Sequence, residues 1–115
     1  MIAKTFSATV LGIVAHLIEV EVDVSVGMSV FNIVGLPDGT IKESRDRILS
    51  AINNSGYSFP VRKIVVNLAP APLRKIGSGF DLPISLALLG TMGIFPPENL
   101  SRAMVVGELS LDGEA

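Results

Sequence analysis

The sequence predicts one α+β domain with two layers, a β-sheet and a layer of helices, and three observations support this fold class. Valines alternate with polar residues over residues 17–26, which is the period-two pattern of a half-buried strand. Apolar residues recur at helical spacing over residues 40–55. A continuous apolar run within residues 62–69 is typical of a central strand. The predicted element order is β-β-β-α-β-α-β.

The bulk composition indicates a folded, soluble domain. A length of 115 residues is typical of one structural domain, so residues 1–115 are predicted to form a single domain. Apolar residues make up 49% and charged residues 17%, which excludes an intrinsically disordered chain. No apolar run reaches the roughly 18 residues of a membrane span, and no signal-peptide pattern is present. The chain has no cysteine, and we expect a bacterial or archaeal cytoplasmic protein with no membrane partner.

Three strands are predicted before the first helix, at residues 4–11, 17–26 and 30–35. Their side chains are β-prone, and glycines separate them. Because the connections are short, we expect the three strands to be sequential antiparallel neighbours. His16, the sole histidine, is expected in the turn before the second strand.

The first helix is predicted over residues 40–55. Thr40 and Glu43 have the spacing of a capping box, and Asp38 is a rival N-cap. Gly56 suits a left-handed C-cap. One apolar stripe should face the sheet, and it consists of Ile41, Ile48, Leu49 and Ile52.

The second half of the chain adds two strands and a helix. The strand at 62–69 is expected to be central and covered on both faces. A helix from an N-cap at Asp81 through Met92 is apolar almost all round, so it should be buried. A fifth strand is predicted at 103–111, followed by a turn at Asp112-Gly113. No returning strand follows that turn, so we expect a domain truncated before its final strand or strands, within a longer protein.

Charge is distributed unevenly along the chain. The net charge of −2 argues against a free-standing DNA-binding module. Residues 41–80 nevertheless hold seven basic and two acidic residues, while both flanks are acidic. This middle segment could present an anion-facing patch, and a solvated surface of mixed charge is the alternative interpretation.

Five basic residues are the candidates for contacts with nucleic acid or a protein partner. Lys42, Arg45 and Arg47 are predicted on the polar side of the first helix, and Arg74 and Lys75 begin a later loop. Contacts with phosphates would make binding depend strongly on salt concentration. A solvated helix face is the alternative.

The loop before the second helix is a weaker candidate for a phosphate site. Backbone N–H groups at Gly77, Ser78 and Gly79 could approach a phosphate near the helix N-terminus. Asp81 at the same helix end would repel that phosphate, which favours a purely structural loop. The sequence contains neither the Gly-x-x-x-x-Gly-Lys-Ser/Thr nucleotide motif nor a Gly-x-Ser-x-Gly elbow.

No metal site and no catalytic residue are predicted. Glu19, Glu21 and Asp23 share one face of one strand, but such neighbours lie about 6.5–7 Å apart, too far to hold one ion without other ligands. A single histidine offers no His-rich metal site, and no serine elbow accompanies it. We therefore expect no cofactor within residues 1–115.

Six sequence blocks carry a family resemblance. They are Phe31-Asn-Ile-Val-Gly-Leu-Pro37, Lys42-Glu-Ser-Arg-Asp-Arg47, Asn53-Asn-Ser-Gly56, Val66-Asn-Leu-Ala-Pro70, Phe80-Asp-Leu-Pro-Ile84 and Gly107-Glu-Leu-Ser-Leu111. Together they resemble the N-terminal domain of the magnesium-chelatase-like AAA+ ATPases, the ComM or YifB group of competence-related proteins. The resemblance covers essentially the whole chain.

The resemblance implies a larger machine. It implies a downstream AAA+ ATPase module that binds ATP and Mg²⁺ in a protein several times longer than this chain. Such proteins are similar to hexameric motors that act on DNA, with a role in branch migration during natural transformation. The implied partners of this domain are the downstream module, neighbouring subunits and DNA.

The implied fold resembles the Lon-protease-like version of the ribosomal protein S5 domain 2 fold. In the matching loop the position of the Lon nucleophile falls on Gly79, with Ser78 one residue out of register, and the dyad lysine would lie beyond Ala115. A peptidase would lack its nucleophile, so the resemblance implies a non-catalytic module. The alternative is a Lon-like hydrolase, or a small-molecule kinase-like domain that holds phosphate on the Gly77–Gly79 loop.

Overall fold

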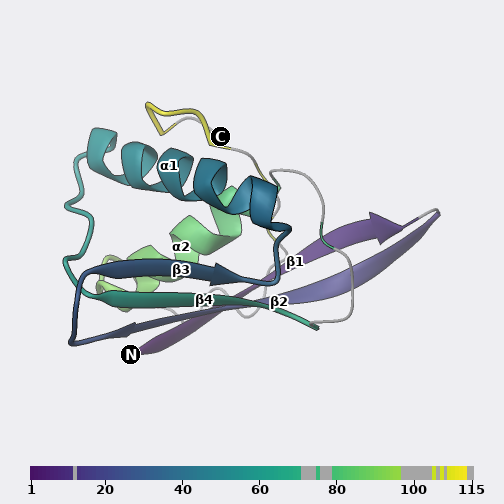
Figure 1. Ribbon diagram of the computed structural model, residues 1–115, viewed down its shortest axis with the longest axis horizontal. Coiled ribbons are helices and arrows are strands. Elements are labelled where there is room, and N and C mark those ends of the chain that lie inside the picture. The colour runs from purple at the N-terminus through teal and green to yellow at the C-terminus, as the bar shows by residue number, and fades with distance from the viewer. Residues whose placement is uncertain are drawn as a thin grey trace.

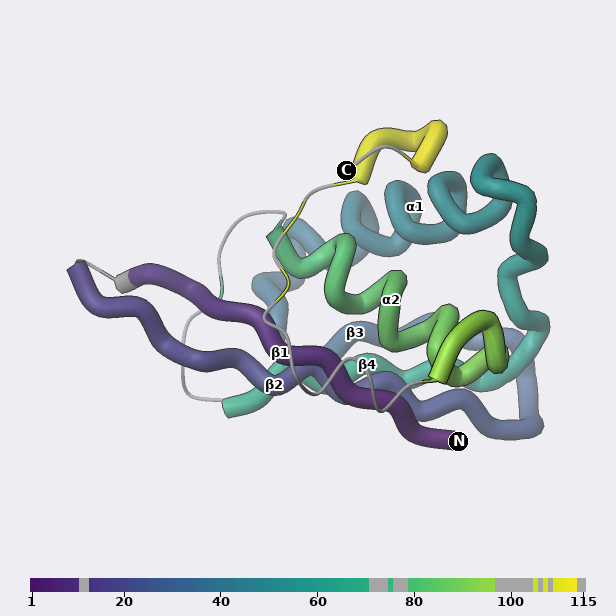
Figure 2. The backbone as a smooth tube through the Cα atoms, turned by 180° about the vertical axis from the view of Figure 1, so that it is seen from behind, coloured from purple at the N-terminus to yellow at the C-terminus, as the bar shows by residue number. Residues whose placement is uncertain are grey.

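The computed structural model describes residues 1–11, 13–70, 75, 79–96, 105, 107 and 109–113. Its elements are β1 (Ile2–Leu11), β2 (Val14–Ser25), β3 (Val30–Val34), α1 (Asp38–Asn54), β4 (Lys63–Ala69) and α2 (Asp81–Thr91). Both helices lie on the same face of a four-stranded sheet (Figures 1 and 2). The described residues thus confirm the two-layer α+β class and the order of the first six predicted elements. They include no helix long and apolar enough to cross a membrane.

The strand order is β1-β2-β4-β3, so one predicted pairing is wrong. β1 and β2 are antiparallel neighbours as expected, but β4 lies between β2 and β3. β3 pairs with β4 in parallel, because α1 crosses over between them and returns the chain in the same direction. The apolar run of β4 suits the inner position, while the five-residue β3 takes the outer one.

The core fills the space between the helices and the inner face of the sheet. The largest apolar side chains in it come from alternate positions of the strands and from one stripe of each helix: Ile18, Val20, Val22, Ile64, Val66, Leu68, Ile48, Ile52, Ile84 and Leu88. Val65 and Asn67, on the other face of β4, are only half-buried. The prediction that this strand is covered on both faces is therefore wrong, because both helices pack on the same side.

The start of α1 differs from the prediction. The helix begins at Asp38 after Pro37, and no side chain caps it. The hydroxyl of Thr40 donates to the carbonyl oxygen of Pro37 at 2.9 Å instead of accepting from a helical N–H group. The predicted capping box with Glu43 and the rival cap at Asp38 are both wrong, because the helix starts early enough to place Thr40 inside its first turn.

The end of α1 is as predicted. Gly56 has a φ of +93°, in the left-handed region. Its N–H donates to the carbonyl of Asn53 at 3.3 Å, and the N–H of Tyr57 donates to that of Ile52 at 3.2 Å. These two bonds form a Schellman motif, which satisfies carbonyl groups that the helix leaves unpaired.

β1 and β2 form an arm that extends beyond the rest of the sheet. β4 pairs with β2 only from Glu19 onward, so among the strands that the structure describes residues 7–11 and 14–18 pair only with each other. We call these residues, with Ile13 at the tip, the β1–β2 arm, and both views show it projecting from the body (Figures 1 and 2). His16 lies inside β2, so its predicted place in a turn is wrong.

The predicted strand at 103–111 falls largely outside the described residues. Within it, the N–H of Val105 donates to the carbonyl of Phe6 on β1 at 2.7 Å. The predicted turn at Asp112-Gly113 is present, with the N–H of Gly113 donating to the carbonyl of Ser110 at 3.1 Å. The last described residues thus lie against the body of the domain.

Candidate functional site

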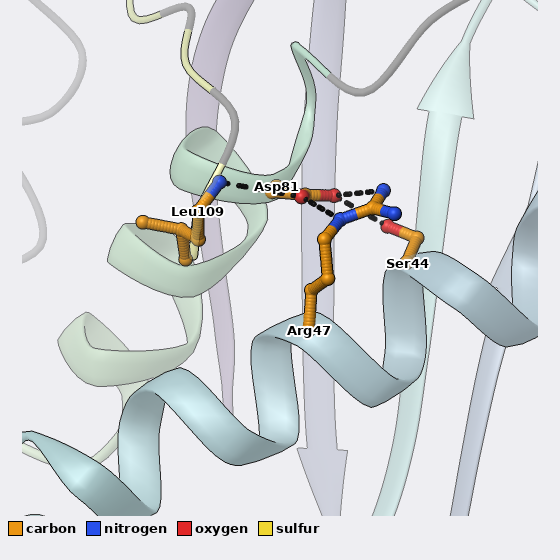
Figure 3. Close-up of polar contacts among 4 residues, drawn as sticks. All are labelled: Ser44, Arg47, Asp81 and Leu109. Carbon is orange, nitrogen blue, oxygen red and sulfur yellow. Dashed lines mark hydrogen bonds and ion pairs between the residues drawn. The ribbon is translucent and has the colours of Figure 1, made fainter. Parts of the chain in front are cut away.

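A buried polar cluster joins α1, α2 and the C-terminal segment (Figure 3). The carboxylate of Asp81, the first residue of α2, is its centre and is 1% exposed. Oδ1 accepts from the hydroxyl of Ser44 at 2.7 Å and from Nη2 of Arg47 at 3.2 Å. Oδ2 accepts from Nε of Arg47 at 2.5 Å and from the backbone N–H of Leu109 at 3.4 Å. Each carboxylate oxygen therefore has two donors.

Local sequence explains why these groups meet. Ser44 lies on the stripe of α1 that faces the core, between Ile41 and Ile48 at helical spacing, and Arg47 follows it by one turn. The carboxylate also carries its charge at the N-terminal end of α2, where the helix dipole favours an anion. The predicted N-cap role of Asp81 is wrong, because Phe80 is the N-cap and the Asp81 side chain turns toward α1.

Sequence reasoning missed this cluster. The available signal was Ser44, a polar residue within an apolar stripe, because a buried hydroxyl needs a hydrogen-bond partner. Nothing local identified that partner as Asp81, which is 37 residues away. With both oxygens occupied by donors, the carboxylate is poorly placed to take a proton from a substrate. The geometry is that of a structural clamp between the two helices.

The basic residues predicted on α1 have partners within the domain. Arg47 pairs with Asp81, and Nη1 of Arg45 donates to the carbonyl of Phe31 on β3 at 3.1 Å. Nζ of Lys42 lies 2.8 Å from Asp46 one turn along the same helix, and this hydrogen bond lowers the pKa of Asp46. Of the three candidates, Lys42 is exposed, whereas Arg45 and Arg47 are half-buried. Their use as nucleic-acid or partner contacts stays a prediction.

The candidate phosphate loop is described only in part. Arg74, Gly77 and Ser78 lie outside the described residues. The carbonyl of Gly79 accepts from the N–H of Gly107 at 2.9 Å. Lys75 is buried, and its Nζ donates to the carbonyl of Pro70. Burial lowers the pKa of Lys75, because the charged ammonium loses its hydration. The phosphate loop itself stays a prediction.

Replacing Lys75 with methionine is expected to stabilise the chain at pH 7. Folding at that pH must bury the charged ammonium. Between the lowered folded-state pKa and the ordinary value of 10.5, the folded state has lost the proton that the unfolded state still binds, so wild-type stability rises with pH. The advantage of the Lys75→Met variant should therefore shrink toward pH 10.5. Urea unfolding at several pH values measures it, and a pH-independent difference would contradict the assignment.

The three carboxylates on the outer face of β2 are paired with cations. Nζ of Lys4 lies 2.8 Å from Glu19 and 3.8 Å from Glu21, and the N-terminal amine of Met1 lies 3.7 Å from Asp23. The hydrogen bond and charge of Glu19 raise the pKa of Lys4. Within the described part of the chain, no group of three or more His, Cys, Asp or Glu side chains could hold a metal ion.

Comparison with known proteins identifies the family. The family model described as subunit ChlI of Mg-chelatase matches residues 20–115. The protein YifB of Salmonella typhimurium is 47% identical over 112 residues, which cover 97% of this chain and 22% of that protein. YifB of Escherichia coli is 50% identical over 103 residues, covering 90% of this chain and 20% of that protein.

A third relative carries a functional name. The competence protein ComM of Haemophilus influenzae is 40% identical over 113 residues, covering 98% of this chain and 22% of ComM. The chain thus spans about a fifth of the length of the curated relatives it matches. The chain belongs to the magnesium-chelatase ChlI-like family, in the group that contains YifB and ComM.

Proposed function

We propose that this chain is a non-catalytic N-terminal module of a ComM-type AAA+ ATPase and that it serves the assembly of the motor. The observation that carries the proposal is the match to ComM, which covers almost all of this chain but only 22% of ComM. The name of that relative connects it with competence. The remaining length leaves room for an ATPase module that would bind ATP and Mg²⁺.

The described polar groups support a structural role for this module. The carboxylate of Asp81 is occupied by three donor residues, and Lys4 holds Glu19 and Glu21 together on the outer face. Such internally satisfied groups fix the shape of a domain. In the proposed protein, hydrolysis of ATP and movement of DNA, including branch migration by a hexamer, belong to the downstream module.

The partners of the two α1 arginines favour assembly over direct DNA contact. A DNA-binding surface needs cations that can neutralise phosphates. Nε and Nη2 of Arg47 donate to a buried carboxylate, and Nη1 of Arg45 donates to a β3 carbonyl, so both side chains are held by contacts within the domain. Lys42, whose partner is exposed on the same helix, is the least restrained of the three.

ATP hydrolysis by the full-length protein tests the proposal. We expect DNA to stimulate hydrolysis and the Lys42→Glu variant to keep that stimulation. We also expect removal of residues 1–115 to weaken oligomer formation, which sedimentation measures. A full-length protein that hydrolyses no ATP would overturn the proposal.

A second readout separates assembly from DNA contact. If Lys42 touched a phosphate, its replacement would weaken DNA binding for all sequences and reduce the salt slope of binding by about one. An unchanged salt slope in the Lys42→Glu variant is the result expected for an assembly module. The matched control is Lys63→Glu, which reverses an exposed charge at the start of β4.

A further inference from the structure

The segment of residues 109–113 runs from the start of α2 to the end of α1, and its two halves are held differently. Leu109 is 5% exposed, and its N–H donates to the buried carboxylate of Asp81 (Figure 3). Residues 110–112 are exposed. We call Leu109 the anchor and residues 110–113 the strap end, which Figure 2 shows in yellow beside α1. The anchor belongs to the core, whereas the strap end lies on the surface.

The strap end meets the last turn of α1 at Leu111 and Gly113. Nδ2 of Asn54 donates to the carbonyl of Leu111 at 2.8 Å, in an exposed hydrogen bond. Gly113 lies so close to α1 that a Cβ atom there would collide with the hydroxyl of Ser55 and come within 3.3 Å of the carbonyl oxygen of Ala51. Leu111 itself is 57% exposed. Segments held by exposed hydrogen bonds and little apolar burial open at a low cost in free energy.

A recess of about 100 Å³ lies between the two helices beside this segment. Leu109 and Gly113 form part of its wall. Leu82, Leu86 and Leu89 of α2 also line it, and all three are half-buried. Well-packed interiors leave few voids larger than a water molecule, so the strap end covers this apolar seam without filling it. The missing contacts would otherwise hold the strap end down.

The anchor is fastened more firmly than the strap end. The side chain of Leu109 is buried between the helices. Two residues earlier, the N–H of Gly107 donates to the carbonyl of Gly79 at 2.9 Å, and its carbonyl accepts from the N–H of Leu82 at 3.0 Å. A pull on the chain beyond residue 113 would therefore break the exposed bond to Asn54 before it disturbed the anchor.

We propose that the strap end is a releasable joint, which lifts from α1 while the anchor stays docked. Lifting uncovers the last turn of α1 and the apolar recess beside it. The inference deepens the proposed function, on which it rests, because in the proposed motor the chain beyond residue 113 leads toward the ATPase module. The joint thus couples the position of that module to a surface that serves assembly.

A reversible disulfide in the full-length protein tests the joint. A Cβ atom at position 113 would lie 3.5 Å from that of Ser55, a separation that suits a disulfide. Residues 1–115 contain no cysteine, and cysteines elsewhere would first be replaced. Oxidised glutathione converts the two thiols of the Ser55→Cys/Gly113→Cys variant into a disulfide and is itself reduced to two molecules of glutathione. We expect this bond to form and dithiothreitol to reopen it.

Hydrogen exchange measured by mass spectrometry reports release without any need for ATP hydrolysis. In the wild type, we expect residues 109–113 to exchange about tenfold or more faster than α2, because the strap end opens without global unfolding. The disulfide should slow that exchange by about tenfold and leave α2 unchanged. It should also lower DNA-stimulated ATP hydrolysis about tenfold, and dithiothreitol should restore it.

Three results would overturn the proposal. Failure of the disulfide to form would show that the strap end does not lie on α1. Equal exchange of residues 109–113 in the oxidised and reduced variant would show that no local release occurs. Full DNA-stimulated ATP hydrolysis by the oxidised variant would show that the motor works with the strap end closed.

Matched variants separate the disulfide from its side effects. Gly113→Cys alone carries the same backbone strain, because Gly113 has a φ of +95°, and Ser55→Cys alone carries the other thiol. ATP hydrolysis by either single variant should not change on oxidation. A reduced protein that hydrolyses no ATP would sink the proposed motor, whereas exchange slowed by the disulfide would leave the joint standing. Normal hydrolysis with equal exchange in both redox states would sink the joint alone.

Discussion

Replacing Arg47 with alanine is expected to destabilise the chain by about 3–5 kcal/mol, because it leaves a buried carboxylate without its counter-ion. Asp81 is 1% exposed and cannot turn to water. The hydroxyl of Ser44 and the N–H of Leu109 would remain as its donors, and neither is charged. Urea unfolding followed by circular dichroism at pH 7 measures the loss. Lys42→Ala, which breaks an exposed pair on the same helix, should change the stability far less.

Removing the other partner of the pair, in the Asp81→Ala variant, should destabilise the chain less. In the Asp81→Ala variant the guanidinium of Arg47, whose side chain is 21% exposed, can turn toward solvent. The double variant should therefore be more stable than Arg47→Ala alone, since the uncompensated carboxylate is gone. If the two single losses simply add in the double variant, Arg47 and Asp81 are not the coupled pair that their geometry indicates.

This asymmetry affects the interpretation of functional data. A variant of Arg47 that lowers DNA-stimulated ATP hydrolysis would be expected from loss of the fold alone. The same holds in part for Arg45, which holds a β3 carbonyl. Lys42 is the position on α1 at which a change in DNA stimulation could be attributed to contact.

Features that depend on a few adjacent residues were predictable from the sequence. Gly56 ends α1 because the left-handed turn and its two hydrogen bonds involve only the following residue and the last helical turn. The period-two pattern of β2 likewise reports directly on which side chains face the core. The bounds of α2 were predictable to within one residue, because the segment is apolar along its whole length.

Features that join distant residues were not predictable in this way. Sequence proximity favoured pairing of β3 with β2, whereas the crossover through α1 places β3 beside β4. Asp81 has the local appearance of an N-cap, but a charged partner one helix away binds its carboxylate more strongly than a neutral backbone N–H would. The partners of Arg45 and Arg47 were not predictable for the same reason, because they lie on β3 and α2.

Replacing Gly35 with alanine is the second substitution with a large expected effect. Gly35 has a φ of +107°, in the region that side chains rarely adopt. A Cβ atom there would lie 2.7 Å from the carbonyl oxygen of Leu68 and 3.0 Å from its Cβ. Backbone strain of about 1–3 kcal/mol and overpacking of a similar size together predict a loss of about 2–6 kcal/mol, measured by urea unfolding.

Substitutions at two other glycines separate the effect of backbone strain from the effect of the close contact with Leu68. Gly56 also has a positive φ, but a Cβ there would meet nothing within 4 Å, so Gly56→Ala should cost about 1–2 kcal/mol. Gly39 lies in the first turn of α1 with open space around it, so Gly39→Ala should stabilise the chain by about 0.5–1 kcal/mol. Equal losses at Gly35 and Gly56 would mean that the contact with Leu68 contributes nothing.

The close approach at Gly35 lies where the paired strands β3 and β4 end. The parallel register places Val34 opposite Asn67, so Gly35 comes against Leu68 at the end of the β3–β4 pair. A larger residue at position 35 would push β3 away from β4 at the point where the chain turns into α1. The atoms of Leu68 that a Cβ at position 35 would meet, the carbonyl oxygen and the Cβ atom, are both kept in Leu68→Ala. The loss in Gly35→Ala should therefore not be reduced when Leu68→Ala is added. The clash with the Leu68 carbonyl would persist, so the double variant should remain well below wild-type stability.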